Sequence, residues 1–360
     1  MEIDIVGLLH EGIRLETEEG KKHEASKVGS LRGGNSGSLI ETTEGLATIG
    51  GCARKALLRS MSLEIPDTED MNSKAWMFAA GHLNEDGWVR WLERSWTVGP
   101  VLREADVPTN WSTRNGTPVT GRPDIVLAHK VTGPVVGLEL KQASSIWTVR
   151  DVLRDKPKTP HLCQAGHYSW QLGVPFELHY ANRVNYHVLG AHLGWIGGHF
   201  PRYNQRHSDK CDYKLGEPQE ATADSMYKNG KVKLGKPAKP AFQEIFRVLP
   251  FVHGFKLRWD ENGVMHYRPH DLGLDAEKQT LISQEGIREF YETAASAIET
   301  DKLPPRPAML DALGEPAKWN DCTYCPLHKL CDEYQGGTRG WVSRVKSETE
   351  LLRKEAEERS

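Results

Sequence analysis

The chain has no long hydrophobic run. None of its apolar stretches approaches the roughly 18 residues that a membrane-spanning helix needs. Its first residues, MEIDIVGLLHEG, carry acidic side chains where a secretory signal peptide would carry basic ones. From the sequence we therefore expect a cytoplasmic protein with no membrane partner.

A strong net charge of either sign is also missing. The 46 lysines and arginines nearly balance the 49 aspartates and glutamates, which leaves a net charge of −3. Without a global basic field, the phosphates of a nucleic-acid partner would have to meet local basic patches. Arg54, Lys55 and Arg59 form one such patch, and the lysines of residues 228–239 form another. Either patch could contact phosphate or could simply be solvated.

Cysteine is scarce, with six in the chain. In a reducing cytoplasm, cysteines indicate metal binding more than disulfides. Cys322, Cys325 and Cys331 follow the pattern C-x₂-C-x₅-C, and three thiols so close together seldom occur without a metal. A fourth ligand is needed, and the spacing alone does not separate zinc from an iron–sulphur cluster. Cys163 is expected in the core, and Cys211 lies in a polar segment.

Hydrophobic periodicity predicts both helices and strands. Apolar residues at three- and four-residue spacing predict helices over residues 52–61, 73–96, 159–173 and 283–303. Thr159 is the expected N-cap of the third helix and Gly173 its stop. Period-two segments predict hairpins over residues 124–142 and 253–268 and strands over 176–183 and 186–193. The fold class expected is α/β, with a mixed sheet between helical layers.

Composition suggests how the chain is divided. Residues 1–51 read as an N-terminal helix followed by a flexible loop, with GGNSGS (residues 33–38) as part of that loop. Residues 52–335 form the expected main domain, in which the polar stretch 203–250 is an insertion. Residues 336–360 are charged on most faces and are expected to form an exposed helical tail.

The first predicted hairpin contains the most informative residues. Asp124 begins it, and Glu139 and Lys141 lie two apart in an apolar strand, so their side chains share one face. Two buried carboxylates are costly unless a cation neutralises them. Mg²⁺ or Mn²⁺ would suit them, because hard divalent ions bind carboxylate oxygens, waters and phosphates. The alternative is an ordinary solvated hairpin that carries common polar residues on its outer face.

The order Gly-Arg-Pro-Asp, hairpin, Glu-Leu-Lys resembles the PD-(D/E)XK nuclease superfamily, through Pro123-Asp124 and Glu139-Leu140-Lys141. This resemblance implies a restriction-endonuclease-like fold in which Asp124, Glu139 and the backbone carbonyl of Leu140 bind the metal. Lys141 would then position the attacking water. The following helix carries Gln164 and Tyr168 in the pattern Q-x-x-x-Y, which resembles the RecB-like branch. There they would hydrogen-bond phosphate or stack a base.

RecB-like relatives also carry a glycine followed by His-Glu on a helix before the hairpin. Here the sequence is AAGHLNEDGW, with Asn84 at the position of the histidine and Glu85 at the position of the acid. His82, directly after Gly81, is the other candidate ligand. The third metal ligand is therefore either Glu85 or His82.

One cysteine before the nuclease core and three after it resemble the RecB-like iron–sulphur nucleases, including the CRISPR-associated exonuclease family and its phage-borne relatives. That resemblance makes Cys52 the fourth ligand, beside Cys322, Cys325 and Cys331, of a [4Fe–4S] cluster that joins the ends of the domain. A structural zinc site is the rival.

The resemblance implies a Mg²⁺- or Mn²⁺-dependent DNA nuclease, with single-stranded exonuclease activity expected first and endonuclease or flap activity second. Its setting would be recombination, DNA end processing or CRISPR spacer acquisition. A recombination or CRISPR adaptation protein would be a partner, and oligomers are possible. The alternative function is a non-catalytic iron–sulphur module that binds DNA through a degenerate nuclease fold.

Overall fold

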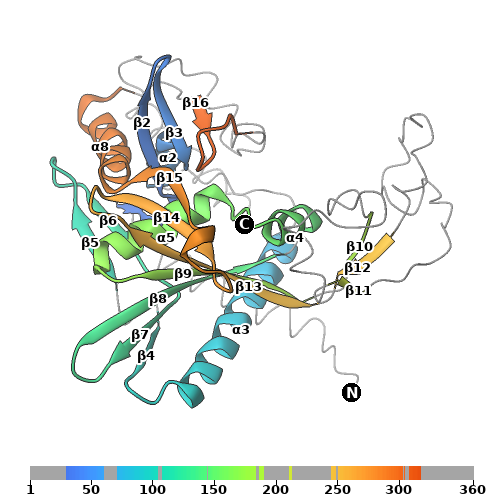
Figure 1. Cartoon of the computed structure of the whole chain (residues 1–360). Helices are drawn as coiled ribbons and strands as arrows, with labels where there is room; N and C mark the ends of the chain where they lie inside the picture. Colours follow the sequence, from blue (N-terminus) through green and yellow to red (C-terminus); the bar gives the residue numbers. More distant parts are fainter. Residues whose placement is uncertain are drawn as a thin grey trace, which may run out of the picture.

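The computed structural model describes residues 30–60, 71–103, 108–143, 145–183, 186–189, 211–212, 245–248, 250–302, 304 and 308–317. These segments form a mixed α/β structure in which sheets are flanked by helices (Figure 1), and this coarse prediction from the sequence is confirmed. The predicted N-terminal helix and the charged tail 336–360 lie outside the described residues. Among the described helices, none combines the length and apolarity that crossing a bilayer requires.

A seven-stranded sheet forms the centre of the molecule, in the order β15-β14-β13-β9-β8-β7-β4. Its strands are β4 (Val101–Arg103), β7 (Ile125–His129), β8 (Gly133–Gln142), β9 (Phe176–Asn182), β13 (Phe251–Trp259), β14 (Val264–Pro269) and β15 (Lys278–Ser283). Only β8 and β9 run parallel in this sheet. A parallel pair needs a crossover connection, and helices α4 (Ile146–Leu153) and α5 (Thr159–Leu172) supply it.

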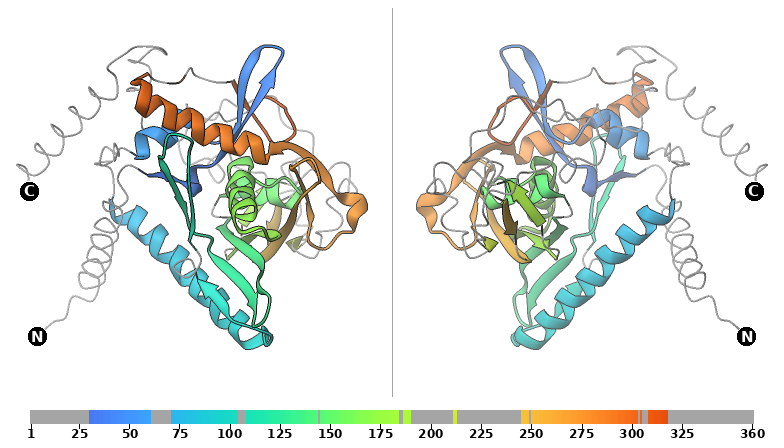
Figure 2. Two further views of the ribbon diagram at one scale, coloured as in Figure 1. Left: turned by 90° about the vertical axis from the view of Figure 1, so that its left-hand side faces the viewer. Right: turned by 90° about the vertical axis from the view of Figure 1, so that its right-hand side faces the viewer.

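The two faces of this sheet bury different clusters. Helix α3 (Met71–Ser95) packs on one face, where Val89 joins Ile125, Leu138 and Leu140. The opposite face carries the larger cluster, in which α5 covers the aromatic and aliphatic side chains of β9 and β13. The views in Figure 2 show α3 running along one side of the sheet, away from α5. Alternation along β8 therefore sends Leu138 and Leu140 towards α3, and Glu139 and Lys141 towards α5.

Three smaller sheets complete the described part of the chain. Strand β3 (Gly45–Gly50) pairs with β2 (Gly37–Thr42) and with β16 (Ala308–Leu310), so segments from both ends of the sequence share one sheet. The other two sheets contain β1 (Leu31–Arg32), β6 (Pro118–Gly121) and β5 (Thr109–Ser112), and β10 (Tyr186–Leu189), β12 (Ile245–Val248) and β11 (Cys211–Asp212). The remaining elements are α2 (Ala53–Ser60), α8 (Gln284–Thr300) and the 3₁₀ turns η1 (Gly33–Asn35) and η5 (Leu274–Ala276).

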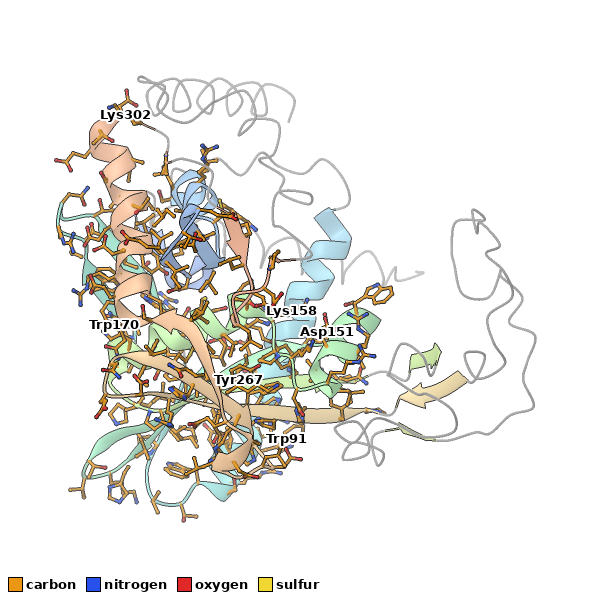
Figure 3. The ribbon with its side chains drawn as sticks, turned by 45° about the horizontal axis from the view of Figure 1, so that its top comes forward. Trp91, Asp151, Lys158, Trp170, Tyr267 and Lys302 are labelled. Atoms are coloured by element: carbon orange, nitrogen blue, oxygen red, sulfur yellow. The ribbon has the colours of Figure 1, made fainter. Side chains whose placement is uncertain are left out.

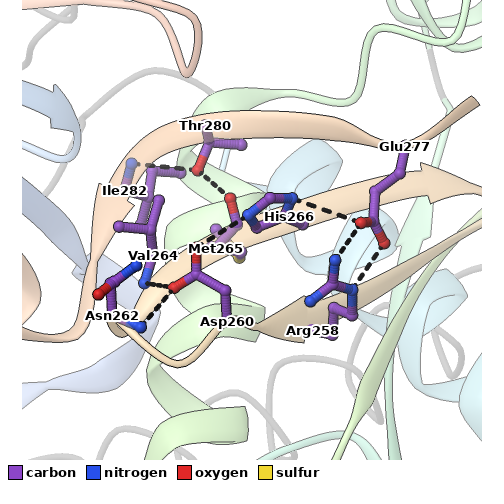
Figure 4. Close-up of polar contacts among 9 residues, drawn as sticks. All are labelled: Arg258, Asp260, Asn262, Val264, Met265, His266, Glu277, Thr280 and Ile282. Carbon is purple, nitrogen blue, oxygen red and sulfur yellow. Dashed lines mark hydrogen bonds and ion pairs between the residues drawn. The ribbon is translucent and has the colours of Figure 1, made fainter. Parts of the chain in front are cut away.

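Both predicted hairpins are confirmed, as β7–β8 and β13–β14. The second is fixed by a polar network at its turn (Figure 4). The Asp260 carboxylate accepts hydrogen bonds from the backbone N–H groups of Asn262 and Val264, at 2.9 and 2.8 Å. His266 lies between Asp260 and Glu277, and Glu277 also pairs with Arg258. This network joins β13, β14 and the start of β15.

Two local predictions were wrong. Helix α5 begins at Thr159, with Lys158 at the N-cap position, because the Thr159 hydroxyl accepts a hydrogen bond from the backbone of Ala312 instead of capping its own helix. The predicted loop over residues 33–38 holds only the short turn η1, and its last two residues begin β2. Pairing with β3 gives that segment its extended form despite its glycines.

Candidate active site

The β7–β8 hairpin brings Asp124 to the same place as Glu139 and Lys141. Ile125 pairs with Leu138, and Asp124 stands one residue before this last rung of the ladder. The Asp124 Oδ2 atom accepts a hydrogen bond from the backbone N–H of Leu140 at 2.6 Å. The carboxylate is therefore fixed at the end of β8 between the two other predicted residues.

Glu139 is the most constrained side chain of the site. It is 0% exposed, and its Oε1 atom lies 2.5 Å from the Lys141 ammonium. Its Oε2 atom is buried and, among the residues that the structure describes, has no hydrogen-bond partner. Burial and the negative charges of Asp124 and Glu85 raise the pKa of Glu139 to about 8, although Lys141 acts in the opposite direction. Within the described part of the chain, one carboxylate oxygen of the site is thus buried without a hydrogen-bond partner.

Lys141 remains a cation in this setting. Burial acts to lower its pKa, but the charges of Glu139 and Asp124 outweigh burial and raise the pKa above its ordinary value. About a fifth of the Lys141 side-chain surface, 21%, stays exposed. Lys141 is held between the carboxylates and the surface as a hydrogen-bond donor.

The backbone of Leu140 contributes to the same edge. In a strand, the N–H and C=O groups of one residue point to the same side, and the Leu140 N–H points to Asp124. Continuing the register of β7 and β8 by two residues would place Pro123 opposite Leu140. Proline has no N–H to donate, so it cannot satisfy the Leu140 carbonyl. The Leu140 carbonyl therefore suits the metal-ligand role that the resemblance implies.

Helix α3 brings Glu85 close enough for its charge to raise the pKa of Glu139. Asn84, at the place of the family histidine, is buried, and its side-chain oxygen accepts a hydrogen bond from the Arg183 guanidinium. The Asn84 side-chain oxygen is thus already bound by the Arg183 guanidinium. The side chain of His82 lies outside the described residues, so the choice between His82 and Glu85 stays a prediction.

Helix α5 presents Gln164 and Tyr168 to the sheet, and the Gln164 amide lies 3.4 Å from the Tyr168 hydroxyl. Tyr168 is only 2% exposed, so its ring cannot stack on a base, and that part of the prediction was wrong. Burial and the charge of Glu139 raise the pKa of Tyr168 well above its ordinary value, which keeps the phenol neutral. Its ring occupies a space left by Gly33 and Gly121, whose added Cβ atoms would lie 2.8 and 2.5 Å from Tyr168 Cε1.

His161 belongs to this site, although the sequence analysis did not select it. It stands three residues before Gln164 and seven before Tyr168, the spacing of one helix face. Its Nδ1 atom lies 2.8 Å from the Tyr180 hydroxyl, and Tyr180 pairs with Lys141 across β8 and β9. Burial and the charges of Lys141 and Lys158 lower the pKa of His161 well below its ordinary value. The helical spacing with Gln164 was the signal that could have identified it.

The predicted cluster ligands are only partly described. Cys52 is half-buried just before α2, whereas Cys322, Cys325 and Cys331 lie outside the described residues. Cys163 is fully buried, as predicted for a core cysteine. Arg54 is buried and donates a hydrogen bond to the Pro304 carbonyl at 2.6 Å, so of the two alternatives for this patch, phosphate contact or solvation, neither describes its side chain.

The donors present fit a Mg²⁺ or Mn²⁺ ion that is completed by substrate. In the part of the chain that the structure describes, no three His, Cys, Asp or Glu side chains gather into a ready-made metal site. Asp124 and Glu139 supply two carboxylates. Glu139 Oε2 has no hydrogen-bond partner among the described residues and could bind a cation. Mg²⁺ sites in proteins often use one or two carboxylates and fill the remaining positions with water and phosphate.

The comparisons with known proteins leave the chain without a family. No protein-family model matches it, and no curated protein matches it. A solved structure described as "Crystal structure of SSO0001" has a TM-score of 0.28 and 18% sequence identity with this chain. The match covers 36% of this chain and 58% of that one, less than two thirds of its length, and it carries no argument about fold or function.

Proposed function

We propose that the protein is a metal-dependent deoxyribonuclease with a RecB-like PD-(D/E)XK fold, acting first of all on single-stranded DNA. The observation that supports this most is the fully buried Glu139 beside Asp124 and Lys141, of which one oxygen has no hydrogen-bond partner in the part of the chain that the structure describes. A solvated hairpin would not bury an acid among like charges, because that costs stability without a compensating ligand.

The residues of the site divide the work of phosphodiester hydrolysis. Asp124, Glu139 and the Leu140 carbonyl would hold Mg²⁺ or Mn²⁺, with Glu85 or His82 as the further ligand. When bound, the ion supplies Lewis-acid chemistry, polarising the phosphate and lowering the pKa of water. Lys141 would donate a hydrogen bond that orients the attacking water. The water oxygen bonds phosphorus as the bond to the 3′ oxygen breaks, leaving a 5′-phosphate and a 3′-hydroxyl.

The remaining residues of the proposal hold the substrate and the fold. Gln164 would donate an amide N–H to a phosphate oxygen of the DNA backbone. The buried Tyr168 hydroxyl, 3.4 Å from the Gln164 amide, would hold Gln164 in place. Cys52, Cys322, Cys325 and Cys331 would bind a [4Fe–4S] cluster that joins the two ends of a domain over residues 52–335. We place the protein in the cytoplasm, in recombination, end processing or CRISPR spacer acquisition, as a single chain or an oligomer with a partner of that pathway.

A second candidate function is a non-catalytic iron–sulphur module that binds DNA. The observation that favours it is Asn84, which replaces the expected histidine and is bound by Arg183. The intact set of Asp124, Glu139 and Lys141 favours the nuclease.

One assay separates the two functions. End-labelled single- and double-stranded DNA is incubated with Mn²⁺ or with EDTA, using wild type, Lys141→Ala and the control Lys130→Ala. Lys130 is exposed in the turn between β7 and β8. We expect Mn²⁺-dependent cleavage of single strands by wild type and the control, and a loss of about 10²- to 10³-fold in Lys141→Ala. If wild type and Lys141→Ala degrade DNA equally, or neither does, the nuclease proposal fails.

A further inference from the structure

Residue His161 lies in the first turn of α5, beside the residues assigned to hydrolysis but outside the metal-ligand set. Its position relative to Lys141 follows from two contacts. Tyr180 pairs with Lys141 across β8 and β9, and the Tyr180 hydroxyl contacts His161 Nδ1 at 2.8 Å. The imidazole thus lies near enough to Lys141 to feel its charge, and it shares a helix face with Gln164.

The hydrogen bonds of Tyr180 determine which imidazole nitrogen carries the proton. The Tyr180 oxygen accepts the backbone N–H of Lys158 at 3.0 Å, and Tyr180 is fully buried. Its own O–H proton therefore needs an acceptor, since a buried hydroxyl without one is costly. Within the described residues, His161 Nδ1 is the acceptor that this hydroxyl has. Nδ1 accepts, so the neutral ring carries its proton on Nε2.

The Nε2–H group is available to a ligand. In the described part of the chain it has no hydrogen-bond partner, and it is not among the buried unpaired atoms, so solvent reaches it. The charges of Lys141 and Lys158 act on the ring, and burial and these charges hold the pKa of His161 low. A neutral N–H donor on which the charges of two lysines act, in the first turn of a helix, favours an anion.

We propose that His161 is a hydrogen-bond donor, through Nε2–H, to a non-bridging phosphate oxygen of the bound DNA strand. Tyr180 is the positioning residue that fixes this tautomer. The inference rests on the proposed nuclease function and extends it, because His161 and Gln164 together form a row of neutral donors along α5. These two donors would hold the strand backbone over Lys141 without adding charge to the site.

The test uses the full-length protein and a single-stranded, end-labelled oligonucleotide with Mn²⁺. His161→Gln keeps an amide N–H near the position of Nε2, and His161→Leu keeps the bulk without a donor. We expect kcat/KM to fall about 10- to 100-fold in His161→Leu. In His161→Gln, kcat/KM should stay within about threefold of the wild-type value. Tyr180→Phe removes the hydroxyl that fixes the tautomer, and its kcat/KM should lie between the values of the two His161 variants.

A methylphosphonate scan supplies a readout that a purely structural role would not change. One phosphate at a time is replaced by a neutral methylphosphonate, and the penalty is measured in wild type and in His161→Leu. At one phosphate the penalty should shrink in His161→Leu, because the partner of the missing oxygen is already absent. Equal penalties at every phosphate, or equal losses in the Gln and Leu variants, overturn the inference. Wild type that cleaves no DNA overturns the proposed function itself, whereas fully active His161→Leu overturns only the role of His161.

Discussion

Glu139 lies in the interior of the main sheet with none of its surface exposed, and Asp124 and Glu85 add negative charge near it. Lys141 pairs with one Glu139 oxygen, and among the described residues the other oxygen has no hydrogen-bond partner. Such an arrangement lowers the stability of the folded state. Active sites are where proteins keep arrangements of this kind, because perturbed acids suit metal binding and catalysis.

The first prediction concerns the pH dependence of stability. Between the ordinary pKa of 4.5 and about 8, folded Glu139 holds a proton that the unfolded chain has released. The free energy of unfolding should therefore fall as pH rises through this window, by at most about 1.4 kcal/mol per pH unit. In Glu139→Gln this contribution disappears, and the variant should be more stable than wild type at the alkaline end. Urea unfolding in EDTA across the window measures the slope.

The control for this experiment is Glu261→Gln, in the exposed turn between β13 and β14. It should keep the wild-type slope. Equal slopes in wild type and Glu139→Gln would mean that the buried carboxyl has an ordinary pKa, contrary to the site described above.

At the scale of elements, the position of α5 decides which side chains reach the site. Its inner face holds His161, Gln164 and Tyr168 over β8 and β9, and Figure 3 shows the start of this helix, marked by Lys158, beside the Asp151 region of α4. Two glycines from distant segments, Gly33 and Gly121, leave room for the Tyr168 ring. The turn η1 and the end of β6 therefore form a surface on which α5 packs.

The second prediction tests the packing of α5 on this surface. In Gly121→Ala the new Cβ would lie 2.5 Å from Tyr168 Cε1 and 2.7 Å from Thr109 Oγ1, so the helix or the strand must shift. We expect a loss of about 1–3 kcal/mol in the free energy of unfolding and reduced cleavage of DNA. Gly87→Ala, inside α3, is the matched control because its nearest neighbour, Trp91, lies 3.9 Å away. That variant should gain about 0.5–1 kcal/mol, since alanine favours helix over glycine. A Gly121→Ala protein as stable as wild type would contradict the tight packing described.

At the scale of the whole molecule, two described parts that lie far apart in the sequence, residues 45–60 and residues 304 and 308–310, are joined. Strand β16 pairs with β3, and Arg54 in α2 donates to the carbonyl of Pro304. Cys52 stands at the start of α2, so the proposed cluster would reinforce a junction that backbone pairing already makes. The three other proposed ligands, Cys322, Cys325 and Cys331, lie outside the described residues, so the [4Fe–4S] cluster stays a prediction.

Iron content is the third prediction. Protein purified without oxygen should contain iron and acid-labile sulphide in equal amounts. Cys52→Ser should lose most of both, because one of four thiolate ligands is missing. Cys163→Ala should keep them, since the Cys163 thiol is buried in the core and donates to the Ile49 carbonyl. Zinc in place of iron, or full iron content in Cys52→Ser, would contradict the proposed ligand set.

The sequence predicts the parts of this molecule in which local pattern and burial agree. Both hairpins alternate apolar and polar residues, and α5 has the helical spacing, so these elements could be predicted from local pattern. The grouping of Asp124, Glu139, Lys141, Gln164 and Tyr168 into one site came from the resemblance to the PD-(D/E)XK nucleases. Other features depend on partners far away in the sequence. Strands β2 and β3 contain glycines and obtain their form from pairing with each other and with β16. Likewise, the helical spacing places His161 on the face of Gln164, but its hydrogen bond with Tyr180 could be found only in the structure.

The central claim is that Asp124 and Glu139 bind a divalent cation, and calorimetric titration of the metal-free protein with Mn²⁺ tests it most directly. Wild type and the exposed-turn variant Glu261→Gln should bind Mn²⁺ alike, whereas Asp124→Asn should bind at least about tenfold more weakly. Equal binding by wild type and Asp124→Asn, or no binding by wild type, would contradict the claim.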